Sequence, residues 1–339
     1  MRYEDAGVDR SAADDAKTRI AALAKASFNP AVLTEIGSFG GMFRADFAGY
    51  EEPVLVASSD GVGTKIKIAL AMGKHDTIGY DIVAHCVDDI LVQGAVPLFF
   101  MDYVAFGKLD PVRVEAVVSG IARACKDLGC PLLGGETAEM PGTYAEDDYD
   151  LAGFIVGIVD RPRALTGAHV REGDHLVGLP SSGLHTNGYS LARKALFEEG
   201  GYDVATRLPE LGGSIGAALL EPHRSYLAAF GPLLERGDIR ALAHITGGGF
   251  EGNIPRVIPA GLGVRIRKSA WDVPPLFRLI QKSGGVDEDE MYATFNMGIG
   301  MIAIVAPERL HAVEHSLERR GESPHLIGTV VKGSGVVLE

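Results

Sequence analysis

The sequence has few features of exported, disulfide-bonded or membrane-anchored proteins. It contains only three cysteines, Cys86, Cys125 and Cys130, and no C-x-x-C pair. Their odd number and apolar surroundings favour buried free thiols over a disulfide framework. No apolar run approaches the roughly 20 residues that cross a bilayer, and the first residues lack the apolar core of a signal peptide. We therefore expect a cytoplasmic protein with no membrane partner.

Positive charge is also scarce. The 339 residues include 32 Lys and Arg against 45 Asp and Glu, which gives a formal net charge of −13. Nucleic-acid-binding surfaces need clustered basic residues, so no nucleic-acid partner is expected. A phosphate-bearing ligand would have to be held locally, by backbone N–H groups, a metal ion or single basic side chains.

The chain has no Walker A loop, which argues against a P-loop enzyme. One G-x-G-x-x-G occurs, at Gly247–Gly252, but it does not form the first strand–helix turn of a predicted domain, where the dinucleotide-binding motif stands. A dinucleotide-dependent dehydrogenase is therefore not favoured.

The length and the element pattern predict two domains of roughly 150 residues each. Strands and helices are mixed in both halves, so we predict an α+β fold of two mixed domains. The 44 glycines against 17 prolines indicate tight turns rather than disorder. The stretch 161–174 predicts a boundary that divides the chain into residues 1–168 and 169–339.

The helix at 111–128 has the clearest signals. Asp110 is a suitable N-cap, Pro111 suits the first helical position and Gly129 suits the position after the end. Residues 65–70 fit either a strand or a helix. Further helices are predicted at 77–93, 187–199, 216–236, 274–283 and 307–320, with strands at 53–58, 98–106, 130–133, 150–159, 175–180, 262–268, 299–305 and 326–332.

The first candidate site follows the strand at 53–58, which should end in a turn at 59–61. It consists of Asp60–Lys65, with the sequence DGVGTK. Glycine lets the backbone approach an anion, lysine supplies a positive charge and aspartate can bind Mg²⁺. A simple turn with a solvated lysine fits the same residues.

The predicted helix at 77–93 places Asp81 and Asp88 together on its polar side. Asp89 instead projects at the edge of the apolar face, where a carboxylate needs a partner such as a metal ion, a lysine or a helix N-terminus. A partly exposed aspartate at the helix rim is the alternative. The neighbouring His85 is more simply interpreted as a structural histidine.

Four glycine-rich segments could contact a ligand. A predicted loop at 134–142 would present backbone amides and Glu136 at the C-terminal end of a strand, where ligand sites form in parallel sheets. Residues 181–188 and 244–250 each lead towards a helix and could hold a phosphate. Residues 37–41 could be a mobile lid. Connecting loops, or a disordered linker at 37–41, fit these segments as well.

Taken in order, these segments resemble the phosphoribosylformylglycinamidine cyclo-ligase (aminoimidazole ribonucleotide synthetase) family over nearly the whole chain. No single motif decides the resemblance, but the ordered set is specific. The matching segments are Tyr3–Asp9, Asp60–Lys65, His75–Gly79, Val92–Phe100, Gly134–Gly142, Ser181–Ser190, His244–Phe250 and Phe295–Gly300.

The resemblance implies a fold and a reaction. The fold would be an N-terminal ATP-binding and dimerisation domain, whose β-sheet joins that of a second subunit in a homodimer, followed by a C-terminal α/β-type domain. The reaction would convert formylglycinamidine ribonucleotide and ATP into aminoimidazole ribonucleotide, ADP and phosphate in de novo purine biosynthesis. The cofactors would be ATP and Mg²⁺.

The resemblance also implies roles for individual residues. The metal ligands would be Asp60, Asp89 and Glu136. The ATP-binding residues would be Gly40, Gly41, Asp60, Gly61, Gly63, Thr64, Lys65, Gly134, Gly135, Glu136 and Thr137. The substrate-binding residues would be Ser182, Gly183, His185, Asn187, Gly247, Gly248 and Gly249, and the catalytic residues would be Lys65, His185 and His244.

Two rival interpretations fit the sequence less well. A selenophosphate synthetase typically has a reactive cysteine near its N-terminus, whereas the first cysteine here is Cys86, and relatives of that type have Asp in place of His244. A catalytically silent nucleotide-binding scaffold would not need to keep the charged residues of the predicted site. The family usually has Asn at the position of Asp88, so the role of that residue stays open.

Overall fold

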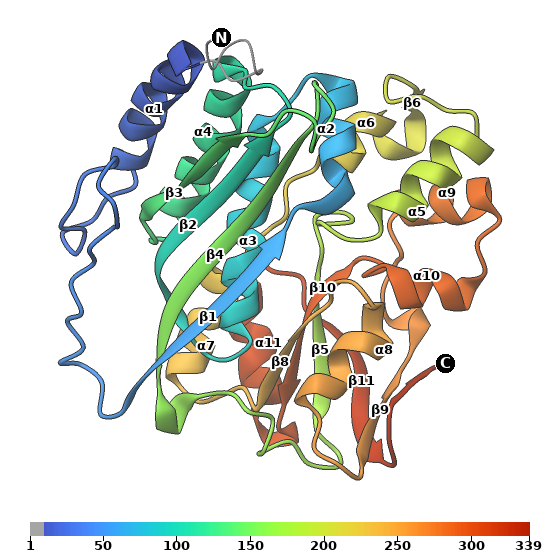
Figure 1. The fold of residues 1–339 in the computed structure, drawn as a ribbon. Coiled ribbons are helices and arrows are strands. Elements are labelled where there is room, and N and C mark those ends of the chain that lie inside the picture. The colour runs from blue at the N-terminus through green and yellow to red at the C-terminus, as the bar shows by residue number, and fades with distance from the viewer. Residues whose placement is uncertain (1–9) are drawn as a thin grey trace. The chain divides into compact units, whose positions relative to one another are not determined.

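The computed structural model describes residues 10–339, so the expected match at Tyr3–Asp9 lies outside the described residues. The chain forms two compact units (Figure 1). The first contains the described residues up to Ile90 together with Pro97–Ile158, and the second contains Leu91–Val96 and Val159–Glu339. No helix among the described residues is long and apolar enough to cross a membrane.

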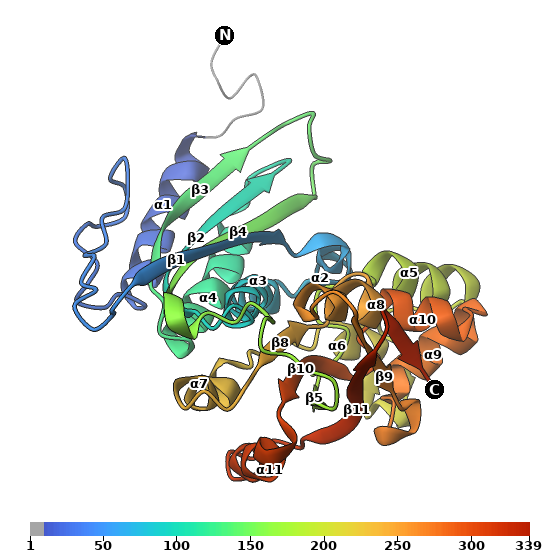
Figure 2. The same ribbon diagram turned by 90° about the horizontal axis from the view of Figure 1, so that it is seen from below.

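The first unit is built on a four-stranded sheet. Its strands are β1 (Pro53–Gly61), β2 (Val96–Phe106), β3 (Leu132–Glu139) and β4 (Tyr149–Asp160), in the order β1-β4-β2-β3. The helices are α1 (Arg10–Lys25), α2 (Ile66–Met72), α3 (Asp76–Leu91) and α4 (Pro111–Asp127). Figure 2 shows α3 and α4 on one face of this sheet.

The other face of this sheet carries exposed apolar side chains. Leu55 on β1, Met101 on β2 and Phe154 on β4 are 58%, 36% and 48% exposed. Successive side chains of a strand point to opposite faces, so the same strands also contribute buried residues such as Phe100 and Ile155 to the core under the helices. We call this exposed apolar surface, formed by Leu55, Met101 and Phe154, the sheet face.

The local signals of α4 are confirmed. The Asp110 carboxylate accepts a hydrogen bond from the Val112 N–H at 2.9 Å, Pro111 occupies the first turn and Gly129 has a left-handed φ of 72°. The cysteine prediction is confirmed as well, because Cys86, Cys125 and Cys130 are all free and buried.

Two predictions for the first unit were wrong, and one open alternative is settled. β1 continues through Gly61 instead of turning at 59–61. Residues 66–72, which fitted a strand or a helix, form helix α2. The expected loop at 134–136 lies inside β3, where Gly134, Gly135 and Glu136 pair in parallel with Met101, Asp102 and Tyr103 of β2. Glycine fits there because a Cβ at Gly135 would lie 2.1 Å from Oδ1 of Asp102.

The second unit is built on a six-stranded sheet. Its order is β12-β9-β11-β5-β10-β8, and the pairs are antiparallel except that β12 runs parallel to β9. The strands are β5 (His175–Pro180), β8 (Ala241–His244), β9 (Leu262–Ile266), β10 (Ile299–Val305), β11 (His325–Lys332) and β12 (Val336–Leu338); a separate pair is formed by β6 (Arg207–Leu208) and β7 (Gly213–Ser214).

Helices lie on both faces of the six-stranded sheet (Figure 2). On one face, Phe230 and Leu233 of α7 and Leu317 of α11 pack in one core cluster with Val177 and Met301 of the sheet. The opposite face carries α5, α8, α9 and α10. The helices are α5 (Tyr189–Arg193), continued by a π-helical turn at Lys194–Glu199, α6 (Ile215–Leu219), α7 (Leu227–Glu235), α8 (Gly249–Asn253), α9 (Pro275–Gly284), α10 (Glu288–Thr294) and α11 (Leu310–Glu318).

The single helix predicted at 216–236 was wrong, because the segment splits into α6 and α7. Pro222 lies between them, and a proline removes a helical hydrogen bond and disfavours the helical conformation of the residue before it. The break places His223 and Tyr226 in the interior, where neither side chain is exposed.

Candidate active site

Two aspartates and a histidine meet at the end of β1 in the first unit. His85 Nε2 lies 2.8 Å from Oδ2 of Asp60 and 3.6 Å from Oδ2 of Asp89. Ser58 Oγ donates to Oδ2 of Asp89 at 3.2 Å. The His85 side chain is almost fully buried, whereas Asp60 and Asp89 are 45% and 26% exposed. The two carboxylates are therefore partly exposed to solvent, and the histidine that contacts them is buried.

The charges of this cluster reinforce one another. Burial opposes the charged form of His85, but its hydrogen bond to Asp60 and the nearby Asp89 carboxylate outweigh burial and raise the pKa of the imidazole. Burial also disfavours the Asp60 carboxylate, yet the His85 hydrogen bond more than offsets it and lowers the pKa of Asp60. His85 is thus more than a neutral core histidine, because its hydrogen bond favours the charged form of Asp60 and its ring lies close to Asp89 as well.

Lys65 lies in a different place from the one expected. Its ammonium forms an ion pair with Asp81 at 2.9 Å, and neither side chain has any exposure. The prediction that Asp81 and Asp88 lie on a polar helix face was also wrong, because both are buried. The phosphate-binding and catalytic roles of Lys65 do not fit this arrangement, since a phosphate could reach its ammonium only if the buried pair opened.

A hollow of about 250 Å³ lies at the other edge of the sheet, between β3, α1 and the Gly37–Gly41 segment. Gly41 packs so closely on β3 that an added Cβ would lie 2.5 Å from Cγ of Leu133. Six of the predicted ATP-binding residues line this hollow: Gly40, Gly41, Gly134, Gly135, Glu136 and Thr137. Asp102 lines it too, and burial raises the pKa of this carboxyl to about 7.

The strand order divides the predicted site of the first unit into two parts. β1, which carries Asp60, and β3, which carries Glu136, are the two edge strands, with β4 and β2 between them. Three strand spacings amount to roughly 14 Å. One metal ion therefore cannot bind Asp60, Asp89 and Glu136 of the same chain, so Glu136 stays a predicted ligand only for an ion separate from the one at Asp60 and Asp89.

The two glycine-rich loops of the second unit lie beside each other. A Cβ added to Gly247 would lie 3.1 Å from Oδ1 of Asn187, so the loop at 181–188 contacts the loop at 244–250. Asn253 fixes the second loop, because its Nδ2 donates to the Gly249 carbonyl at 2.7 Å. The left-handed φ of 90° at Gly248 is one that side chains rarely adopt. The structure thus brings the predicted substrate-binding residues Ser182, Gly183, His185, Asn187, Gly247, Gly248 and Gly249 into one region.

Three buried histidines lie under these loops. The His185 ring stacks on His223 with a centroid separation of 3.9 Å, and Nε2 of His223 lies 3.2 Å from Nε2 of His244. The Ser182 N–H donates to Nε2 of His185 at 3.2 Å. Sequence reasoning identified His185 and His244 but missed His223. The only available signal was Pro222, which breaks the helix pattern just before it.

The histidine cluster is better suited to moving a proton than to binding a metal. The three rings offer nitrogen atoms within 4.8 Å of one another. However, the His185 and His223 planes lie only 22° apart, so their in-plane lone pairs run side by side and do not converge on one point. The nitrogen contact between His223 and His244 has hydrogen-bond length and requires one donor and one acceptor.

Comparison with known families gives the class of the protein. The model of the AIR synthase related protein N-terminal domain matches residues 45–159, and that of the C-terminal domain matches residues 171–339. The predicted α+β fold with two mixed domains is confirmed by these two matches and by the mixed sheets of the structure. The fold and its loops define a two-domain protein of the AIR synthase class.

Curated relatives narrow the class to one family. Three proteins named phosphoribosylformylglycinamidine cyclo-ligase are similar to the chain. The one from Brevibacillus brevis is 50% identical, over 99% of this chain and 97% of its own length. Those from Bifidobacterium animalis subsp. lactis and Desulfitobacterium hafniense are 51% and 52% identical, each over 97% of this chain and 96% of its own length. The chain belongs to the phosphoribosylformylglycinamidine cyclo-ligase family of enzymes.

Solved structures share the fold at low sequence identity. A thiamine-monophosphate kinase from Stenotrophomonas maltophilia has a TM-score of 0.71 at 18% identity, over 95% of both chains. The hydrogenase maturation protein HypE in complex with ATP has a TM-score of 0.64 at 21% identity, over 94% of this chain and 88% of that one. PurL from T. maritima, complexed with AMPPCP, has a TM-score of 0.54 at 15% identity, over 84% and 42%.

Proposed function

We propose that this chain catalyses the ATP-dependent cyclisation of formylglycinamidine ribonucleotide to aminoimidazole ribonucleotide, with release of ADP and phosphate, in de novo purine biosynthesis. The observation that carries this proposal is the identity of about 50% to curated ligases of that name over nearly the whole chain. A cytoplasmic location and a small-molecule substrate follow from such a role.

Phosphoryl transfer would activate the substrate for ring closure. The formyl amide oxygen attacks the γ-phosphorus of ATP, and ADP leaves. A substrate nitrogen then attacks the former formyl carbon, the carbon–oxygen bond breaks, and the oxygen departs with the phosphoryl group as phosphate. One nitrogen-bound proton is lost during closure. The protein's part in such a sequence is positioning and charge neutralisation.

The ATP site is assigned to the first unit. Structures of two proteins with this fold contain ATP or an ATP analogue, which supports nucleotide binding here. The hollow lined by Gly40, Gly41, Gly134 and Gly135 offers backbone that can approach a phosphate closely. Glu136 and Thr137 belong to the same hollow. Gly61, Gly63 and Thr64 follow Asp60 at the other edge of the sheet and would accompany the metal.

A Mg²⁺ ion is assigned to Asp60 and Asp89. The donor set fits, because both groups are partly exposed carboxylates fixed by His85 and Ser58, and Mg²⁺ binds through one or two carboxylates while keeping several waters. When bound, the ion would neutralise charge on the phosphate groups. The residues themselves supply negative charge at a fixed separation, and His85 keeps that charge in place.

The substrate would be held by the loops of the second unit, and the histidines below them would take up the proton. Gly247, Gly248 and Gly249 present unsubstituted backbone beside Asn187. His185 and His244 stay the proposed acid–base residues, with His223 as the group that connects their rings. A proton accepted at either end could therefore be passed to the other through His223.

We further propose a homodimer formed through the exposed apolar sheet face of the first unit. Leu55, Met101 and Phe154 lie on adjacent strands of one sheet. Exposed apolar patches of this kind mark protein–protein contacts in soluble proteins. A second copy of the same face is self-complementary, as a two-fold interface requires.

The proposal is tested by measuring aminoimidazole ribonucleotide and ADP formed from formylglycinamidine ribonucleotide and ATP, with and without Mg²⁺. Asp89→Asn should lower kcat at least about 100-fold, because a neutral amide is a poorer Mg²⁺ ligand and the phosphate charge is left uncompensated. Asp76→Asn on the same helix is the control and should keep parent activity. Near-parent turnover of Asp89→Asn would remove Asp89 from the metal site, and absence of product from the parent would refute the ligase reaction.

A further inference from the structure

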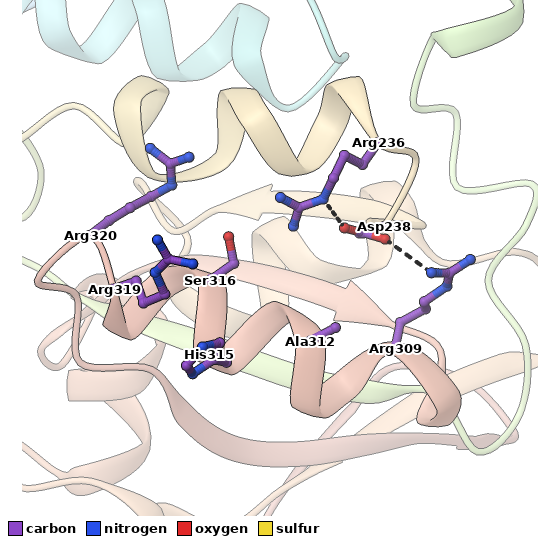
Figure 3. Close-up of a pocket in the computed structure, with 8 residues that line it drawn as sticks. All are labelled: Arg236, Asp238, Arg309, Ala312, His315, Ser316, Arg319 and Arg320. Atoms are coloured by element: carbon purple, nitrogen blue, oxygen red, sulfur yellow. Dashed lines mark hydrogen bonds and ion pairs between the residues drawn. The ribbon is translucent and has the colours of Figure 1, made fainter.

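A basic hollow of about 730 Å³ lies in the second unit beside α7 and α11. Four arginines line it, Arg236, Arg309, Arg319 and Arg320, together with Asp238 and Ser316. Figure 3 shows Arg236 reaching in from the end of α7, while Arg309, Ser316 and Arg319 come from α11 and its flanks. Four guanidinium groups in one hollow are unexpected in a chain whose net charge is −13.

The charges of this hollow are not balanced by its own side chains. Asp238 is the only carboxylate among the lining residues and is 5% exposed. It accepts from Arg236 Nε at 2.7 Å and lies 3.6 Å from a nitrogen of Arg309. The guanidinium groups of Arg319 and Arg320 have no hydrogen bond or ion pair with any residue of the described chain. Positive side chains therefore exceed negative ones by three, with His315 taken as neutral.

Helix electrostatics explain only part of this arrangement. Arg319 and Arg320 directly follow α11, where cations stabilise the C-terminal end of a helix. The same effect applies to Arg236, which directly follows α7, but not to Arg309, which precedes α11. All four nevertheless face the same hollow, and mutual repulsion between them is relieved if an anion enters.

The chemistry of the lining indicates the class of anion. Guanidinium groups match phosphate oxygens with paired N–H donors, and they serve this role better than an ammonium group does. The volume lies within the roughly 300–1,000 Å³ of small-molecule sites. A second hollow of about 490 Å³ shares Arg236 and adds Arg163, Arg171 and Arg240. A chain of phosphates could thus extend from one hollow towards the other.

The hollow lies at the opposite end of the strands from the proposed substrate loops. β5 and β8 both pair antiparallel with β10, so they run in the same direction. Asp238 precedes β8 and lines the hollow, whereas His244 ends β8 and belongs to the histidine cluster. Even the four residues of β8 span roughly 13 Å. The basic hollow is therefore separate from the residues proposed to hold the substrate.

We propose that this hollow is a second anion site, which binds a small molecule that carries a chain of two or more phosphate groups. The arginines bind the phosphate oxygens, Ser316 donates an additional hydrogen bond, and the Asp238 carboxylate holds Arg236 and Arg309 in place. The ligand is either a nucleoside polyphosphate or a polyphosphate without a base, because both present the same group to the arginines.

The test compares the parent with Arg319→Ala/Arg320→Ala and with a control, Arg207→Ala/Arg278→Ala. The control removes two exposed arginines of the same unit and changes the net charge equally. Binding of inorganic tripolyphosphate and of ATP is measured by calorimetry without Mg²⁺. Each lost charged hydrogen bond weakens binding about tenfold or more, so the first variant should bind tripolyphosphate at least about tenfold more weakly, and the control should bind like the parent.

The two ligands distinguish the source of the phosphate chain. Loss of tripolyphosphate binding in the first variant assigns the site to the phosphate chain alone, and loss of only a second equivalent of ATP assigns it to a nucleotide. Binding that is equal in all three proteins, an equal loss in the control, or no binding by the parent would overturn the proposal. Ligase turnover without added polyphosphate should stay at the parent level in both variants, so failure here is separate from failure of the proposed reaction.

Discussion

The buried pair of Lys65 and Asp81 shows that the position of a residue in a motif does not determine which group its side chain contacts. Sequence reasoning placed Lys65 at a phosphate because it follows Asp60 and two glycines. In the fold its side chain turns away from that surface and neutralises a carboxylate of α3. The identity of a residue gives its charge, but only the packing around it decides which group receives that charge.

Lys65→Met should destabilise the fold strongly, because it removes the buried ammonium that neutralises the buried Asp81 carboxylate. The expected loss in the free energy of unfolding is about 3–5 kcal/mol, measured by urea denaturation. Lys67→Met is the matched control: Lys67 forms a partly exposed pair with Asp148, and the loss there should stay below about 1 kcal/mol. Combining Lys65→Met with Asp81→Leu should recover much of the lost stability. A Lys65→Met protein with parent stability and weakened ATP binding would instead restore the phosphate role.

Among the secondary-structure elements, the pairing of β2 with β3 creates an unusual carboxyl group. Asp102 sits beside Gly135 and is buried, and burial, with a smaller contribution from Glu136, raises its pKa to about 7. In the unfolded chain the pKa is about 3.9. Between these values the folded protein binds more protons than the unfolded one, so the free energy of unfolding falls as pH rises from about 4 to 7.

Asp102→Asn should remove this pH dependence. Relative to the parent, the variant should gain stability as pH increases from 4 to 8, by up to about 4 kcal/mol for a shift of some three pKa units. Urea denaturation at several pH values measures the difference. The same change at exposed Asp127 on α4 serves as the control and should give a difference that does not vary with pH. A constant difference for Asp102→Asn as well would mean that this carboxyl is ionised throughout.

At the scale of the whole molecule, the proposed homodimer would bury the sheet face of each subunit against that of the other. Phe154→Glu should dissociate the homodimer, because each two-fold interface would bury two unpaired carboxylates. Light scattering coupled to gel filtration gives the mass directly. Val112→Glu is the matched control, since Val112 is 66% exposed on α4 and not on the sheet face. A Phe154→Glu protein that kept the parent mass would place the interface elsewhere, and a monomeric parent would refute the dimer.

The sequence by itself determined the features that depend on neighbours along the chain. The Asp110 cap, the Gly129 stop and the strand at 175–180 follow from local hydrogen bonding and apolar patterning, and the structure confirms them. The ordered set of motifs was also sufficient to identify the family. The predicted loop at Gly134 and Gly135 was wrong, because β3 continues through both glycines. Its partner strand β2, which leaves no room for a side chain at Gly135, is distant in the sequence, so no local pattern indicates the pairing.

Only the tertiary structure decided which of the predicted site residues lie close together. Strand order separates Glu136 from Asp60 by the width of the sheet, and the break at Pro222 brings His223 between His185 and His244. The arginines of the basic hollow come from segments more than 70 residues apart in the chain. Such contacts depend on how strands pair and helices pack across long loops, and no local pattern of residues encodes that geometry.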